Sequence, residues 1–180
     1  MKKLGILTSL LLLVALMGGT ASAAPGGKSQ GKGAAQAQGQ NAKPFRTMVT
    51  HLTGAQEVPP HETDARGTAV FHLNRGGTSI SYHLVAMNIE DVVAGHIHTG
   101  TVGINGPVVV TLVTPQNCRT VENGIVCKGT FDASALSGPL AGHPLSDLLT
   151  IMREGRAYVN VHTTAFPAGL IRGQLGRHGR

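Results

Sequence analysis

The chain has 180 residues and a formal net charge of +6, with 15 Lys and Arg against 9 Asp and Glu, and aromatic residues make up only 3% of it. Recognition of nucleic acids usually needs a concentrated basic stripe or stacking aromatic side chains. The basic residues here are scattered, except for a C-terminal group formed by Arg172, Arg177, His178 and Arg180. Composition therefore argues against a nucleic-acid partner.

Residues 1–23 have the pattern of a secretory signal peptide. Lys2 and Lys3 give a basic start, a mostly apolar run follows to Met17, and residues 21–23 read Ala-Ser-Ala, which fits a cleavage site for small residues. The alternative is a membrane anchor, but this apolar run is shorter than the about 20 residues that cross a bilayer. We predict cleavage after Ala23, no membrane span afterwards, and a periplasmic or secreted protein.

Residues 24–44 are rich in Gly, Ala, Gln and Ser and contain no large apolar side chain. Such a segment cannot bury a core, so we predict a flexible linker. The pattern changes at Phe45, where short apolar segments begin to recur. We predict a folded domain over residues 45–176, followed by a basic C-terminal tail over residues 177–180.

The domain reads as a series of strands separated by Gly, Asn and Pro. Residues 67–73 and 79–87 both alternate between apolar and polar side chains, and the turn at residues 74–77 predicts an antiparallel hairpin. Further strands are predicted at residues 45–52, around the His96-Ile97-His98 segment, and at residues 107–114, 156–162 and 170–175. The run at 107–114 is rich enough in β-branched residues for a buried strand.

One segment differs, because Leu145, Leu148, Leu149 and Met152 recur at helical spacing. We predict one short helix there, packed against the sheet. Many short strands with a single helix predict a mainly β fold, an antiparallel Greek-key β-sandwich or small barrel.

The two cysteines, Cys118 and Cys127, flank the tight-turn dipeptide Asn123-Gly124. In an exported chain this arrangement predicts a disulfide that clamps a hairpin. The alternative is a redox or metal-binding pair, but the spacing is not that of a CxxC motif and no histidine is close in sequence.

The strongest chemical signal is a set of three histidines. On a strand His96 and His98 project to one face, while Ile97 points to the other. In residues 157–163, Tyr158, Asn160 and His162 share a face in the same way, and we expect this face to lie outside the packed core. If the strands are neighbours, three imidazoles converge. Imidazole is a ligand for Cu and Zn, so His96, His98 and His162 are the predicted metal ligands.

Two interpretations of these histidines stay open. A metal on three imidazoles would leave an open position, and His51, His72 and His83 are candidates for a fourth ligand. Otherwise the three predicted ligands serve hydrogen bonding and turn packing. His72 and His83 point away from the apolar side of their strands, so exposed polar surface is the alternative for them.

Several segments, in this order, resemble the CHRD (chordin) domain: Gly54–Pro60 (GAQEVPP), Gly95–Gly100 (GHIHTG), Gly106–Val110 (GPVVV), Ser137–Leu140 (SGPL), Ala157–Thr163 (AYVNVHT) and Phe166–Gln174 (FPAGLIRGQ). The resemblance covers residues 47–176 and implies an extracytoplasmic β-domain without a settled activity. Leu170 stands where the family usually has an acidic residue, and the two cysteines are outside the family pattern.

A fainter similarity is to the copper-zinc superoxide dismutase sandwich, which also has an HxH strand and a late Val-His. It implies that His96, His98 and His162 surround one metal and that Arg172 attracts anions. No histidine occurs between Ile104 and Gly142, so only a copper site would remain. The alternative for Arg172, which we favour, is a surface or salt-bridging residue.

Three functions follow from these observations. We favour an exported CHRD-domain module that binds Cu or Zn through its clustered histidines. The second is an extracellular adhesion or matrix module that binds proteins or glycans without a metal. The third is a copper-only enzyme similar to superoxide dismutase, and an enzyme is the least favoured of the three.

Overall fold

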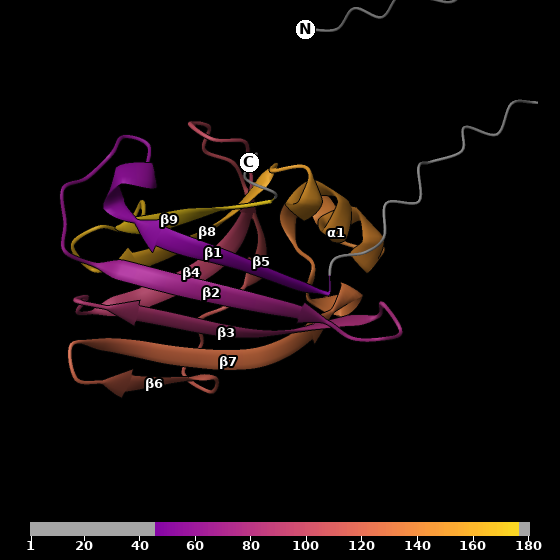
Figure 1. Ribbon diagram of the computed structural model, residues 1–180, viewed down its shortest axis with the longest axis horizontal. Helices are drawn as coiled ribbons and strands as arrows, with labels where there is room; N and C mark the ends of the chain where they lie inside the picture. Colours follow the sequence, from indigo (N-terminus) through magenta and orange to yellow (C-terminus); the bar gives the residue numbers. More distant parts are fainter. Residues whose placement is uncertain (1–45, 177–180) are drawn as a thin grey trace, which may run out of the picture. The chain divides into compact units, whose positions relative to one another are not determined.

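The computed structural model describes residues 46–176. The predicted signal peptide, linker and C-terminal tail, together with Phe45, lie outside the described residues. Within them the chain forms a mainly antiparallel β-structure with one α-helix (Figure 1). The predicted mainly β class, with a single helix in a sandwich or small barrel, is confirmed.

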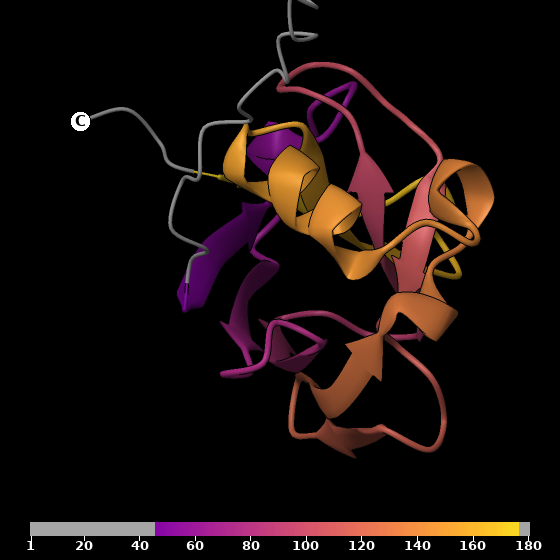
Figure 2. The ribbon, with the colours of Figure 1, turned by 90° about the vertical axis from the view of Figure 1, so that its right-hand side faces the viewer.

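Nine strands form one sheet in the order β5-β4-β8-β9-β1-β2-β3-β7-β6. The strands are β1 (Thr47–Thr53), β2 (Arg66–Leu73), β3 (Ser79–Met87), β4 (Val92–Thr99), β5 (Val108–Thr111), β6 (Cys118–Val121), β7 (Gly124–Asp132), β8 (Ala157–Thr163) and β9 (Ile171–Leu175). A single residue pair, Thr53 with Arg172, joins β1 to β9. The sheet curls at this junction, so β1 to β3 and β4 to β5 lie on opposite sides of the core (Figure 2).

The alternating sequence of β2 and β3 explains how this core forms. Phe71 and Tyr82 face each other across the hairpin, and Phe71, Ile80 and Leu84 are fully buried. The side chains that alternate with them point outward and are exposed, as His72 and His83 are, or half-buried. Apolar side chains therefore fill the inside of the curl, and polar ones cover its outside.

The predicted helix is α1 (Leu145–Arg153), which begins after Pro144 and covers one end of the curled sheet (Figure 2). Leu148 and Met152 are fully buried, as the spacing predicted. Three short 3₁₀ turns accompany it along the chain, η1 (Gly54–Gln56), η2 (Ala133–Ala135) and η3 (Gly138–Leu140). Among the described residues no helix has the length and apolar character needed to cross a membrane.

The cysteine hairpin is formed as predicted. Cys118 on β6 lies opposite Cys127 on β7, and the two are joined by a disulfide. Asn123 takes a positive φ of 58° in the connecting turn, a conformation that asparagine tolerates better than most residues. The disulfide thus secures one edge of the sheet.

One expectation about β8 is wrong. The face that carries Tyr158, Asn160 and His162 was expected outside the packed core, but every residue of β8 is buried. The reason is that loops distant in sequence cover this outward face. Glu57 hydrogen-bonds Asn160 from one loop, and Gly106 hydrogen-bonds Tyr158 from another.

Candidate metal centre

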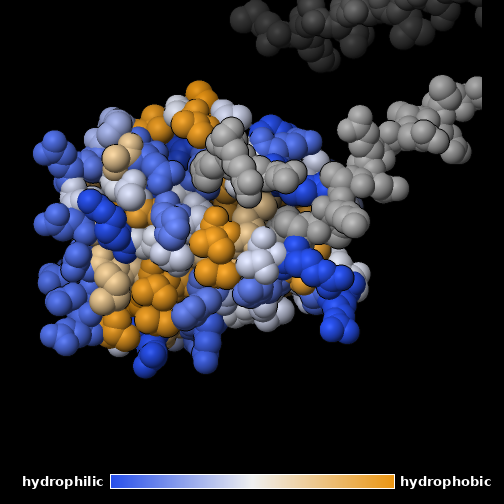
Figure 3. Space-filling view, in the orientation of Figure 1, coloured by the Kyte–Doolittle hydropathy of each residue, from blue (hydrophilic) through white to orange (hydrophobic). Residues whose placement is uncertain are grey.

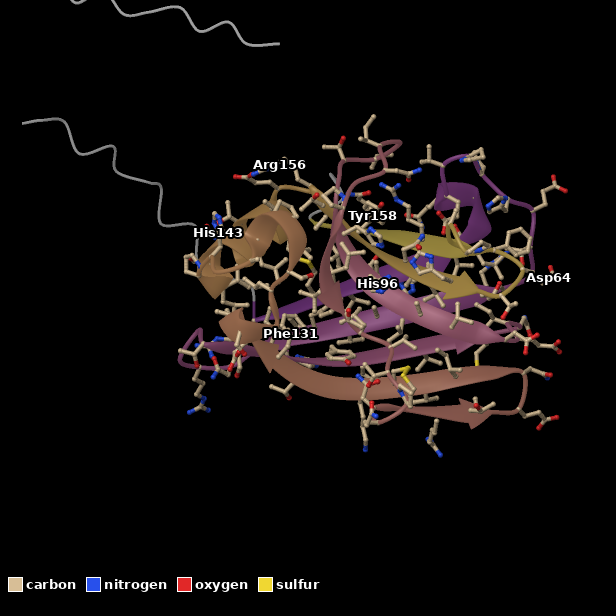
Figure 4. The ribbon with its side chains drawn as sticks, turned by 180° about the vertical axis from the view of Figure 1, so that it is seen from behind. Asp64, His96, Phe131, His143, Arg156 and Tyr158 are labelled. Atoms are coloured by element: carbon tan, nitrogen blue, oxygen red, sulfur yellow. A yellow bond between two sulfur atoms is a disulfide. The ribbon has the colours of Figure 1, made fainter. Side chains whose placement is uncertain are left out.

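Strand pairing brings the three predicted ligands together. β4 and β8 are antiparallel neighbours, with His96 opposite Asn160 and Ala94 opposite His162. Ile97 points into the core and is fully buried, so His96 and His98 project from the outward face of β4. His162 projects from the same face of β8, one diagonal step away. Figure 4 shows His96 on this side of the domain, beside Tyr158.

The imidazoles form a compact cluster. Nδ1 of His96 lies 3.1 Å from Nε2 of His162. The ring centre of His98 is 5.5 Å from that of His96 and 5.9 Å from that of His162. One nitrogen from each of the three residues lies within 4.8 Å of the others. The outward face therefore carries three ring nitrogens that are close enough together to act as ligands of one metal ion.

Backbone carbonyls fix the tautomers of two of these rings. Nδ1 of His98 lies 2.9 Å from the carbonyl oxygen of Gly106, and Nδ1 of His162 lies 3.0 Å from that of Pro167. A carbonyl oxygen only accepts hydrogen bonds, so each Nδ1 carries the proton and donates it. Each Nε2 therefore has a free lone pair.

The two lone pairs have different surroundings. Nε2 of His162 accepts the Nδ1–H of His96. Nε2 of His98 is buried and has no hydrogen-bond partner among the described residues. A buried polar atom without a partner is costly, and such an atom in a native site calls for an explanation.

Burial keeps the cluster uncharged at neutral pH. Desolvation, together with the neighbouring His162 and His98, lowers the pKa of His96 to about 4. Desolvation also lowers the pKa values of His98 and His162. Because neutral imidazole is the form that binds metals, the donors are ready without losing a proton to water.

A layer of polar side chains supports the cluster from β8 and β9. The ring of Tyr158 stacks on His98 at 4.9 Å between ring centres. Because β8 lies between β4 and β9, Tyr158 also meets Arg172, whose guanidinium carbon is 3.5 Å from its ring centre. Tyr158 therefore contacts both the imidazole of His98, by stacking, and the guanidinium of Arg172, by a cation–π contact. These contacts hold the His98 ring in place.

Arg172 is buried, with an exposed fraction of 1%, so its expected surface position is wrong. Its guanidinium donates hydrogen bonds to the carbonyl oxygens of Thr101 and Ile104 and to the side chains of Asn105 and Gln174. It therefore anchors the Gly100–Pro107 loop, which carries the carbonyl of Gly106. Its predicted role in attracting anions stays a prediction.

Sequence reasoning missed Glu57. Glu57 belongs to the Gly54–Pro60 loop, and the residue is buried. Asn160 Nδ2 donates a 2.6 Å hydrogen bond to its carboxylate. Burial raises the pKa of Glu57 to about 7, although Arg172 and Asn160 oppose the shift. In the sequence this loop is marked by its two prolines, Pro59 and Pro60, and no periodicity identifies a loop acid as buried.

The three candidate fourth ligands lie elsewhere. His51, His72 and His83 are exposed on β1, β2 and β3. His51 and His72 contact Thr68 and Thr47. The metal-compatible cluster found in the described part of the chain contains His96, His98 and His162 and none of these.

Fold and site together define a mainly β domain with a three-histidine cluster on the covered outward face of its sheet. The family model of the CHRD domain matches residues 48–175. The chain belongs to the CHRD domain family. No curated protein and no solved structure matches it, and the fainter similarity to copper-zinc superoxide dismutase finds no support in these comparisons.

Proposed function

We propose that this CHRD domain is an exported module that binds one transition-metal ion, copper or zinc, through His96, His98 and His162. One observation carries the proposal. The Nδ1–H groups of His98 and His162 donate to backbone carbonyls, which leaves two Nε2 lone pairs in one cluster, one of them buried without a partner. This is how metal-binding imidazoles are usually oriented, with the second ring nitrogen held by a carbonyl or carboxylate.

The spacing of the nitrogens suits an ion. Zinc–nitrogen bonds are about 2.0–2.1 Å long, so two nitrogens on one ion at angles between a right angle and the tetrahedral value are about 2.8–3.4 Å apart. His96 Nδ1 and His162 Nε2 are 3.1 Å apart. His96 and His162 would hold an ion through these two nitrogens if His96 carried its proton on Nε2 instead of Nδ1.

Three imidazoles leave a coordination position for water or a small ligand. Neutral nitrogen donors without a carboxylate or thiolate suit copper and zinc rather than magnesium or calcium. The covering loops restrict access to the cluster, which supports tight retention of an ion. These features fit a module that stores, buffers or structurally uses a metal.

Export is part of the proposal. CHRD domains occur in extracellular and exported proteins, and residues 1–23 have the signal-peptide pattern. The disulfide between Cys118 and Cys127 is typical of an oxidising compartment. A periplasmic or secreted location is consistent with all three.

Metal analysis of the exported protein, purified without a histidine tag, tests the proposal. We expect about one copper or zinc per chain, and equal rebinding after the metal is stripped. His98→Ala should weaken binding by more than about 100-fold, since even an outer-shell partner is worth about 10–100-fold. No ion, and no binding tighter than micromolar, would reject the site.

His83→Ala is the matched control, because it also removes one strand histidine but from an exposed position. It should bind metal like the wild type. A loss equal to that of His98→Ala would move the site to β3. Circular dichroism of both variants checks that each remains folded.

A further inference from the structure

The side of the sheet formed by β1, β2, β3, β6 and β7 carries a second group of histidines that the metal site does not use. We call this surface the basic face and define it by six exposed residues, His51, Arg66, His72, His83, Arg119 and Lys128. It lies on the side of the domain seen in Figures 1 and 3, whereas His96 is seen from the opposite side in Figure 4. The two surfaces are therefore separate.

Strand register gathers part of this face into one place. His83 lies directly opposite Lys128 on β7, and His72 lies opposite Ser81 on β3. These four residues line a hollow of about 450 Å³ on the sheet surface, together with Thr130. The hollow thus offers the ammonium group of Lys128, two imidazoles and hydroxyl groups side by side.

The charge of the face is one-sided. In the five strands that form it, the one acidic residue is Asp132, at the end of β7. Its carboxylate already accepts hydrogen bonds from the backbone and hydroxyl groups of Ser134. The centre of the face therefore has no negative charge to neutralise its cations, and an anionic partner is the complementary one.

We propose that the basic face binds an acidic polysaccharide, a sugar chain that carries sulfate or carboxylate groups. Lys128 and the imidazoles of His72 and His83 would meet the anionic groups, and the hydroxyls of Ser81 and Thr130 would meet sugar hydroxyls. The hollow accommodates a sugar unit, and the open sheet surface on either side leaves room for the chain to continue.

Other occupants fit less well. Single-stranded nucleic acid needs aromatic platforms, but Phe71, Tyr82 and Phe131 point into the core and are buried. Insertion into a membrane needs protruding large apolar residues, whereas the apolar residues of this face are mainly valines set among polar ones. Residues 24–44 of the same chain are not a complementary occupant, because they contain three lysines and no acid. A second copy of the chain would present the same positive face and would be repelled.

The charged side chains and imidazoles of the face come from all five of its strands. They are His51 on β1, Arg66 and His72 on β2, His83 on β3, Arg119 on β6, and Lys128 with Asp132 on β7. Asp132 is the one acid in these strands and lies at the end of β7, whereas Asp64 and Glu122 are exposed in the segments that flank β2 and β6.

The test measures binding of the folded protein to dextran sulfate and to uncharged dextran, with a chelator present so that no metal contributes. We expect binding to dextran sulfate alone, weakened by salt. The variant His72→Gln, His83→Gln, Lys128→Gln should lose about tenfold or more in affinity.

The matched control removes the same charges elsewhere, with His61→Gln, His143→Gln and Arg156→Gln, and should stay within about twofold of the wild type. Equal losses in both triple variants would overturn the proposal, because net charge alone would then explain binding. Binding only to anionic phospholipid vesicles would also overturn it. Since a chelator is present, neither result depends on the metal site.

Discussion

The inward and outward faces of β8 and β9 are both buried, but for different physical reasons. Val159 and Ile171 face inward and are fully buried among apolar side chains. Tyr158, Asn160 and Arg172 face outward from the same strands and are 3%, 2% and 1% exposed. Equal burial thus arises from apolar packing on one face and from specific polar contacts on the other.

The difference matters because the two kinds of burial tolerate change differently. Apolar packing is non-directional and depends mainly on volume. A buried polar group needs its particular partner, and removing that partner leaves the other group without a hydrogen bond. The outward face can therefore hold a preorganised site. A substitution there should lower the free energy of unfolding more than a substitution of similar size on the inward face.

Arg172→Met should have the largest effect on stability. The change keeps an unbranched stem but removes the hydrogen bonds to the Thr101 and Ile104 carbonyls, and it leaves Glu57 without its neighbouring cation. We expect the free energy of unfolding to fall by about 3–5 kcal/mol. Urea denaturation at pH 7.5 measures it. A loss below about 1 kcal/mol would mean that apolar packing alone holds this face.

Glu57→Gln should change how stability depends on pH. The pKa of Glu57 is raised from 4.5 to about 7 in the fold. Its stabilising contribution is therefore complete below pH 4.5 and is lost as the pH rises through 7. Between pH 5 and pH 8 the wild type should lose about 2–3 kcal/mol relative to the variant.

The histidines do not disturb this comparison. The lowered pKa of His96 gives stability that is present above pH 6.5 and lost as the pH falls through about 4. This effect acts in both proteins and cancels in their difference. If the free energies of unfolding of the two proteins, measured in urea, changed with pH in parallel, the pKa of Glu57 would not be raised in the fold. That result would contradict the prediction.

Ile97→Val should have the smallest effect. Ile97 lies between His96 and His98 in sequence but points into the core, so the change removes one buried methylene at a cost of about 0.5–1.5 kcal/mol. Metal affinity should stay within about twofold of the wild type, because no outward group moves. Isothermal titration with zinc checks this. A larger loss of affinity would show that the two faces are coupled.

Much of the fold could be predicted from the sequence. The alternation in residues 79–87 gave the bounds of β3, and the spacing of Leu145 and Met152 gave the helix. Both signals are local, since they depend on which side chains share a face of one element. The disulfide was also local, because a tight turn brings its two cysteines together.

The covering of the site could not be predicted. Alternating Tyr158, Asn160 and His162 have the pattern of a strand with one exposed face. The Gly54–Pro60 loop contacts Asn160, the Gly100–Pro107 loop contacts Tyr158, and Pro167 contacts His162. Glu57 and Asn160 are about a hundred positions apart in the sequence. No local pattern in either loop reports that contact.

Nitrogen NMR of the histidine rings during a zinc titration tests the central claim most directly. Before zinc is added, His98 and His162 should both be Nδ1–H tautomers. One equivalent of zinc should shift their Nε2 signals while the Nδ1 protons remain, and the signals of His83 should not move. An Nε2–H tautomer in either residue, or zinc-induced shifts confined to the histidines of the basic face, would contradict a metal centre at His96, His98 and His162.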